Sequence, residues 1–161
     1  MTAALVALIG PPGAGKTSER HLYPHAQVVS LDDNRRLLSW CGCSSNQDPI
    51  LRAHAVELAF STARSALAAG CTVLWDATNA DPADRRALLV LAAEYHATTT
   101  AVLVLPRPST VLRRNNRRDQ RPCACGYARR VPDDVVLAMY DAINRDQWSL
   151  DTEGWSEVRI A

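Results

Sequence analysis

With 161 residues, the chain is long enough for one domain with a sizeable core and leaves little room for a second. Its hydrophobic content of 47% and charged content of 22% are ordinary for a soluble globular protein, and no apolar stretch reaches membrane-spanning length. No basic segment precedes the first apolar run, which argues against a signal peptide. We therefore expect a single domain over residues 1–161, located in the cytoplasm and without contact with a membrane.

The charge is unevenly distributed along the chain. The formal net charge is +1, yet residues 107–130 contain eight arginines and one acid, a local charge of +7. A block of this kind is usually a solvated face. Beside a phosphate site, however, an arginine-rich segment can clamp a phosphoryl group and follow a nucleic-acid backbone.

The first predicted strand is an apolar run over residues 3–9, and a glycine-rich turn follows it directly. The turn fits the pattern G-x-x-x-x-G-K-[ST] and reads Gly10-Pro11-Pro12-Gly13-Ala14-Gly15-Lys16-Thr17. Its backbone N–H groups can cradle phosphates, while Lys16, the only lysine of the chain, reaches the β and γ phosphates and Thr17 binds Mg²⁺. The turn therefore predicts a site for ATP and Mg²⁺.

Short strands and helices alternate through the rest of the chain. Strands are expected at about 27–31, 71–75, 98–105 and 155–160, and helices at about 48–69, 81–95, 108–116 and 132–145, with a short one starting near Asn34. Apolar strands separated by helices indicate a parallel sheet covered on both faces. We predict an α/β fold with a five-stranded, mostly parallel sheet and an arginine-rich lid over about 107–131.

Ligands of such sheets bind at the carboxyl ends of the strands, which brings the phosphate loop and the residues after two other strands to one edge. Asp32 follows the second strand and can accept the proton of an acceptor alcohol. Arg35, one helical turn further, can hold an anionic group of that acceptor. The alternative is that Asp32, or more readily Asp33, only caps the helix that follows.

Asp76 and Asn79 follow the third strand and are expected on the acceptor side of the same edge. A carboxylate at position 76 can act on Mg²⁺ through water or buttress the acceptor site. A structural role in its turn is the other interpretation.

Five motifs together resemble the phage-type polynucleotide 5′-kinases and the kinase modules of bacterial RNA-repair enzymes. They are the phosphate loop, Ser-Leu-Asp-Asp-Asn-Arg at 30–35, Asp-Ala-Thr-Asn at 76–79, Arg-Asn-Asn-Arg-Arg at 114–118 and Val-Pro-Asp-Asp-Val at 131–135. The likeness extends from Ala3 to about Ile143. It implies a P-loop kinase fold with Lys16 and Thr17 on the ATP phosphates and Mg²⁺.

The resemblance also implies the roles of the remaining site residues. Asp32 is the general base toward a 5′-hydroxyl, and Arg35 contacts the phosphate on the 3′ side of the terminal nucleoside. Arg114 and Arg118 stabilise charge on the transferring phosphoryl group. Asp76 does not align cleanly, because some relatives carry their acid where Ala77 stands here.

The implied function is an ATP-dependent polynucleotide 5′-hydroxyl kinase that acts on DNA or RNA ends in end repair. Relatives often join this kinase to a phosphatase or ligase domain, whereas here a stand-alone kinase is expected. The rival interpretations are a small-molecule kinase acting on a nucleoside or sugar alcohol, and a nucleotide-dependent switch without an acceptor. The sequence leaves the oligomeric state open, a homo-oligomer included.

Four of the five cysteines form two C-x-C pairs about eighty residues apart, and both pairs should flank the acceptor side. The pairs are Cys41 with Cys43 and Cys123 with Cys125. One interpretation is a tetrahedral zinc site, although the usual spacing is C-x₂₋₄-C. Free surface thiols and, less readily in a reducing cytoplasm, disulfides are the alternatives.

Cys71 opens a buried strand and is expected in the core. Trp40 is expected either to pack against the protein or to stack on a terminal base.

Overall fold

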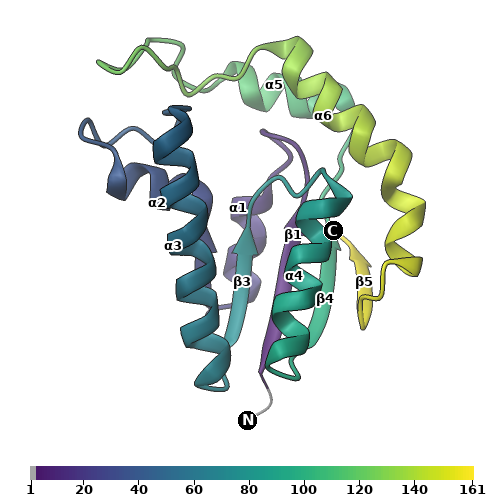
Figure 1. Cartoon of the computed structure of the whole chain (residues 1–161). Coiled ribbons are helices and arrows are strands. Elements are labelled where there is room, and N and C mark those ends of the chain that lie inside the picture. Colours follow the sequence, from purple (N-terminus) through teal and green to yellow (C-terminus); the bar gives the residue numbers. More distant parts are fainter. Residues whose placement is uncertain (1–2) are drawn as a thin grey trace.

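The computed structural model describes residues 3–161 and contains a single five-stranded sheet in the order β2-β3-β1-β4-β5 (Figure 1). The strands are β1 (Ala4–Ile9), β2 (Gln27–Ser30), β3 (Thr72–Asp76), β4 (Thr98–Leu103) and β5 (Glu157–Ile160). Every neighbouring pair is parallel. This confirms the predicted five-stranded α/β fold, with a sheet that is wholly rather than mostly parallel.

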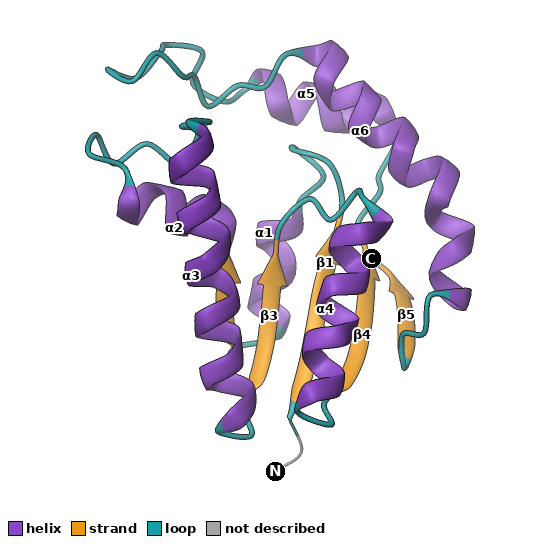
Figure 2. Cartoon of the chain, in the orientation of Figure 1, coloured by secondary structure: helices purple, strands orange, loops and turns teal. Residues whose placement is uncertain are grey.

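The helices match the predicted ones closely. They are α1 (Lys16–Glu19) with the 3₁₀ turn η1 (Arg20–Leu22), α2 (Leu31–Leu38), α3 (Pro49–Ala68), α4 (Pro82–Glu94), α5 (Pro108–Asn116), and α6 (Asp133–Asp146) with η2 (Gln147–Thr152). In Figure 2, α3 and α4 lie in front of the sheet and α1 lies behind it, so helices cover both faces. Among these helices, none is long and apolar enough to cross a membrane.

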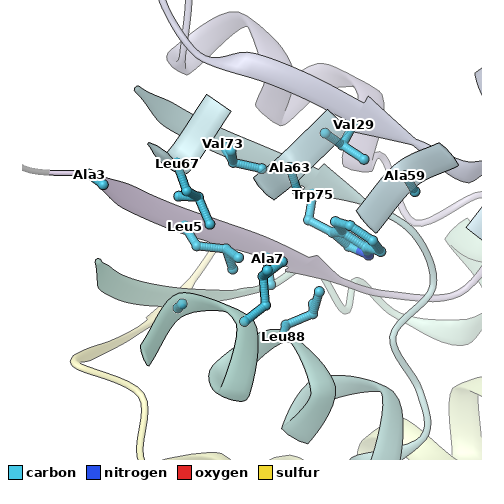
Figure 3. Packing of buried hydrophobic residues seen from close by; sticks show 12 residues of the cluster. Ala3, Leu5, Ala7, Val29, Ala59, Ala63, Leu67, Val73, Trp75 and Leu88 are labelled. Carbon is cyan, nitrogen blue, oxygen red and sulfur yellow. The ribbon is translucent and has the colours of Figure 1, made fainter. Parts of the chain in front are cut away.

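The core alternates between the two faces of β1. Leu5 and Ala7 pack with Val73, Trp75 and residues of α3 and α4, as Figure 3 shows. Val6 and Leu8 point to the opposite face, where they meet Ala14 of the phosphate loop. Because β1 is the central strand, the loop that follows it is anchored to the best-packed part of the molecule.

Two local predictions are corrected. Helix α2 begins at Leu31 rather than near Asn34, because Ser30 is its N-cap and accepts a hydrogen bond from the N–H of Asp33 at 3.3 Å. Neither Asp32 nor Asp33 is therefore a cap. Cys71 is exposed rather than buried, because β3 starts only at Thr72.

The lid segment, residues 117–132, joins α5 to α6 without helix or strand. In Figure 1 it is the green loop that extends toward the blue loop between α2 and α3. The thiols of Cys41 and Cys123 lie together at this point, which confirms that the two loops are in contact. The sheet edge that carries the phosphate loop faces both segments.

Candidate functional site

The phosphate loop is held by close backbone packing. Gly13 and Gly15 have φ angles of +88° and +115°, a region that side chains rarely adopt. A Cβ at Gly13 would lie 2.6 Å from the carbonyl oxygen of Val111, and one at Gly10 would collide with the carbonyl oxygen of Val104. The glycines thus let the loop lie directly against α5 and the residue that follows β4, and they leave a backbone cradle of the kind that binds phosphates.

Lys16 lies within this loop, and its ammonium donates to the carbonyl oxygens of Gly10 at 2.6 Å and Pro11 at 3.1 Å. Burial lowers the pKa of Lys16 to about 8, although the carboxylates of Asp76 and Asp32 act in the opposite direction. The charge of Arg118 lowers the same pKa further. The loop, the ends of β2 and β3, and the lid therefore meet around one ammonium group.

Asp32 lies in the first turn of α2 with its side chain 65% exposed. Its carboxylate is ion-paired with Arg35, whose side chain is only 15% exposed. Arg35 also donates through Nε to the carbonyl oxygen of Ser44 at 2.8 Å. The pair joins the predicted base and the predicted acceptor clamp, and it fixes both against the loop that follows α2.

Asp76 is buried at the end of β3, in register with Leu8 of β1 and Ser30 of β2. Arg20 donates to Asp76 at 2.7 Å and to Asp33 at 3.0 Å. Burial lowers the pKa of Arg20, but the bonds and charges of Asp76 and Asp33 outweigh burial and raise the pKa. Arg20, which was not predicted as a site residue, links the end of β3 and the first turn of α2 to the turn that follows α1.

Asn79 supports the phosphate loop. It is buried, has a φ of +49°, and donates through Nδ2 to the carbonyl oxygen of Leu8 at 2.7 Å. The next carbonyl toward β3, that of Thr78, accepts from the N–H of Gly10 at 3.1 Å. We expected Asn79 to contact the acceptor, but its amide points into the protein, where it donates to a carbonyl group near the end of β1.

Arg85 is a second residue that the sequence analysis missed. Its side chain is 1% exposed and donates to the carbonyl oxygens of Asn79 at 3.1 Å and Ala80 at 2.8 Å. Glu153 accepts from its Nε at 2.9 Å. Burial raises the pKa of Glu153, but Arg85 and Trp155 lower it by more, so the net shift is downward. This buried pair fixes the loop that contains Asn79.

The lid arginines differ in their surroundings. Arg114 donates to the carbonyl oxygen of Ala14 at 2.6 Å and so lies directly on the phosphate loop. Arg118 makes no ion pair within residues 3–161. Burial lowers its pKa, the charge of Arg129 lowers it further, and Asp32 raises it. Arg118 is thus a cation close enough to Lys16 and Asp32 for the charges to act on one another, with Arg129 as a neighbour not singled out before.

The base of the lid is closed by Asn115, which is fully buried. Its Nδ2 donates to the carbonyl oxygen of Val131 at 2.7 Å, and its Oδ1 accepts from the N–H of Val131 at 3.2 Å. Arg130 adds bonds to Asn116 at 2.7 Å and Asp133 at 2.8 Å. These contacts bring the two ends of the lid segment together beside the phosphate loop.

The two C-x-C pairs meet where the α2–α3 loop contacts the lid, beside the edge predicted to bind the acceptor. The Sγ atoms of Cys41, Cys123 and Cys125 all lie within 4.8 Å of one another, and Cys43 follows Cys41 by two residues. A hydrogen bond from Ser39 lowers the pKa of Cys41 to about 7. The N–H of Tyr127 lowers the pKa of Cys125, but burial and the three other thiols raise it to about 12. All four side chains carry free thiols.

Several solved structures share this fold at low sequence identity. A chain of the Pnkp1/Rnl/Hen1 RNA repair complex matches with a TM-score of 0.77 and 17% identity, over 92% of this chain and 46% of that one. Kti12 of Chaetomium thermophilum in complex with ADP-AlF3 matches with a TM-score of 0.64 and 16% identity, over 98% and 88%. The tunicamycin resistance protein of Deinococcus radiodurans matches at 0.55 and 16%, over 98% and 86%.

This chain spans less than half of the RNA-repair chain that it matches, and the identities are too low to show more than the fold. None of the curated protein sequences matches it. A family model described as an AAA domain, however, matches residues 5–145, which is most of the chain. The P-loop of such a domain generally binds ATP with Mg²⁺. The chain belongs to this AAA domain family and has a P-loop fold of the kinase type.

Proposed function

We propose that this protein is an ATP-dependent polynucleotide 5′-hydroxyl kinase. The observation that carries the proposal is the position of Asp32. Its carboxylate is exposed at the acceptor edge, and its charge acts on both Lys16 of the phosphate loop and Arg118 of the lid. A base close to two cations that can bind phosphate is the arrangement that phosphoryl transfer to an alcohol requires.

The loop residues fit ATP and Mg²⁺. Phosphate oxygens would replace the carbonyl oxygens of Gly10 and Pro11 as partners of the Lys16 ammonium. The hydroxyl of Thr17 follows Lys16 and would hold Mg²⁺, which neutralises charge on the phosphate oxygens when it is bound. Asp76, fixed by Arg20, favours the charged form of Lys16 and acts as a positioning residue.

In the proposed step, the acceptor hydroxyl oxygen forms a bond to the γ-phosphorus and its proton passes to the Asp32 carboxylate. The bond from the γ-phosphorus to the bridging oxygen breaks, and its electron pair leaves on ADP. Arg118 and Arg114 stabilise the charge on the transferring group, because Arg114 is bonded to the phosphate loop and the charge of Arg118 acts on Lys16.

A polymeric acceptor is favoured by the charge around the site. Residues 107–130 carry +7, a field that a small neutral alcohol does not need. Arg35, held beside Asp32 by its bond to Ser44, would contact the phosphate on the 3′ side of the terminal nucleoside. Trp40 is 77% exposed, so it is free to stack on a terminal base rather than packed in the protein.

The test is transfer of label from γ-³²P-ATP to a panel of acceptors at equal concentration. The panel contains single-stranded DNA and RNA oligonucleotides with 5′-hydroxyl ends, a nucleoside 3′-monophosphate and the free nucleoside. We expect the highest kcat/KM for an oligonucleotide and the lowest for the nucleoside. A nucleoside that is phosphorylated as well as the oligonucleotides would favour the small-molecule kinase, and ATP binding without transfer to any acceptor would favour the switch.

A further inference from the structure

The strongest unassigned feature is the thiol cluster between the α2–α3 loop and the lid. The Sγ atoms of Cys41, Cys123 and Cys125 lie mutually within 4.8 Å, and Cys43 follows Cys41 by two residues in the same turn. In a tetrahedral zinc site with Zn–S bonds of about 2.3 Å, neighbouring sulfur atoms are about 3.8 Å apart. The thiols of Cys41, Cys123 and Cys125 are thus within about 1 Å of the separation that such a site needs, and Cys43 would supply the fourth ligand. We propose that Cys41, Cys43, Cys123 and Cys125 bind one structural zinc ion that fastens the lid to the loop after α2.

The backbone around each pair is shaped by a glycine turn. Gly126 has a φ of +86°, and its N–H donates to the carbonyl oxygen of Cys123 at 2.8 Å, while the N–H of Cys123 donates to Tyr127 at 2.9 Å. Gly42 has a φ of +66° between the other two cysteines. No atom lies within 4 Å of a Cβ built at either glycine, so the turns need glycine for its backbone conformation and not for space.

Ser39 supplies the hydrogen bonding expected around a thiolate ligand. Its Oγ accepts from the N–H of Cys43 at 3.2 Å and lies 3.0 Å from the Sγ of Cys41. With the oxygen already accepting, the hydroxyl proton is free to be donated to the sulfur. Hydrogen bonds of this kind fix the orientation of metal ligands and stabilise their anionic form.

The donor set selects the type of metal. The cluster consists of sulfur ligands without a carboxylate or imidazole, and thiolates prefer zinc to Mg²⁺ or Ca²⁺. Four thiolates around Zn²⁺ leave a charge of −2, which the arginines of residues 107–130 can offset. A disulfide, in contrast, would use two of the thiols and leave the other two without a partner.

The metal would set the position of groups on both sides of the acceptor edge. Arg118 and Arg129 flank the Cys123–Cys125 pair in the chain, and Arg35 is hydrogen-bonded to Ser44, next to Cys43. Fastening the two loops reduces the entropy that is lost when these arginines are ordered around an anion. The metal site is independent of the proposed kinase activity, and only its effect on acceptor affinity depends on it.

The first experiment is elemental analysis of the full chain, purified without chelator. We expect about one zinc per chain in the wild type and in the control Cys71→Ser, which changes the one cysteine outside the cluster. The double variants Cys41→Ser/Cys43→Ser and Cys123→Ser/Cys125→Ser should each lose it. After replacement of the zinc by Co²⁺, the wild type should show the visible ligand-field and thiolate charge-transfer bands of a tetrahedral site. The two double variants should lack these bands.

The second experiment needs neither a variant nor activity. Limited trypsin digestion should cut after Arg118 and Arg129 slowly in the zinc-bound protein and faster after removal of the metal by a chelator, with readdition of zinc restoring protection. Three results would each overturn the proposal. The first is far less than one zinc per chain with four freely titrating thiols besides Cys71; the second is a disulfide within the cluster, and the third is iron in place of zinc. Loss of transfer activity with the zinc and the protection intact would instead count against the proposed function.

Discussion

The two sides of the site are built in different ways. On the phosphate side, the backbone itself is held by the fold: Gly10 lies against the carbonyl group of Val104, just after β4, and Gly13 against that of Val111 in α5, with no room for a Cβ. On the acceptor side, side chains do the holding, through the ion pair of Asp32 with Arg35 and the contacts of the lid. Gly42 and Gly126 there have open space around them.

This difference separates the part of the site that would bind the triphosphate from the part that would select the acceptor. A rigid cradle on the central strand can bind the invariant part of the reaction, the triphosphate. Loops fixed by a few polar contacts can change with the acceptor, since each contact is replaceable without disturbing the core. Substitutions on the phosphate side should therefore affect all reactions alike, and those on the acceptor side should depend on the acceptor.

The largest expected effects come from Lys16→Ala and Asp32→Asn. Lys16→Ala removes charge from the phosphates and should abolish detectable transfer together with tight ATP binding. Asp32→Asn should lower turnover by about 10²–10⁴-fold with ATP affinity nearly unchanged, because only proton acceptance is lost. Turnover and ATP titration are measured for both, with Asp151→Asn, an exposed acid of η2, as control. Near-normal turnover in Asp32→Asn would remove the general-base assignment.

The next prediction distinguishes the role of Arg118 in the lid from the role of Arg35 in binding the acceptor. Arg118→Ala should lower kcat by about 10²-fold for every acceptor, since the charge on the γ-phosphoryl group is common to all. Arg35→Ala should mainly raise KM for oligonucleotides and 3′-phosphorylated nucleosides and spare activity on a free nucleoside. Arg145→Ala on α6 serves as the charge-matched control. If both variants lose activity equally across the acceptors, the two roles are not distinct.

A pair of glycine variants tests the structural contrast. Gly13→Ala adds a methyl group 2.6 Å from a backbone carbonyl at a φ of +88°, so it should destabilise the protein by about 3 kcal/mol or more. Gly126→Ala has a similar φ but open space, and only the backbone strain of about 1–2 kcal/mol remains. Chemical denaturation of both variants gives the two values. Equal losses would show that the phosphate loop is no more tightly packed than the lid.

The smallest effect is a pH dependence of ATP binding. Burial lowers the pKa of Lys16 to about 8, so this ammonium is largely neutral at higher pH in the free protein. Bound phosphates favour its charged form, and binding at about pH 9 should therefore take up a proton and weaken as the pH rises. Calorimetry in two buffers of different ionisation enthalpy measures this uptake. Binding at about pH 9 without proton uptake would mean that Lys16 is already charged in the free protein.

Most of the fold could be predicted because its signals are local. The bounds of α5 agree with the prediction at both ends, and Asp48 and Asp81 cap α3 and α4. The start of α2 was missed because Ser30 and the acids after it can all act as caps. The choice is made by the pairing of Ser30 with Asp76 across β2 and β3, which local sequence does not contain.

The phosphate loop of the site could be predicted from the sequence, but the residues that hold the loop and its surroundings in place could not. Gly10–Thr17 is a contiguous motif, whereas Arg20 meets Asp76 across 56 residues and Arg85 meets Glu153 across 68. A signal for Arg85 did exist, because it lies on the stripe of Leu88 and Ala92 that α4 buries. A charged residue on an apolar stripe predicts a buried partner, but not which one. By similar reasoning, Asn79 would have been predicted to support the phosphate loop through a buried hydrogen bond.

The proposed reaction is transfer of a phosphoryl group from ATP to a 5′-hydroxyl. The most direct measurement compares two oligonucleotides that differ only at the 5′ end, one with a hydroxyl and one with a phosphate, incubated with γ-³²P-ATP and wild-type or Asp32→Asn protein. We predict label on the 5′-terminal nucleotide of the hydroxyl form with wild-type protein, a loss of about 10²–10⁴-fold with the variant, and none on the phosphate form. Absence of label on the hydroxyl form, or equal labelling of both forms, would contradict the account.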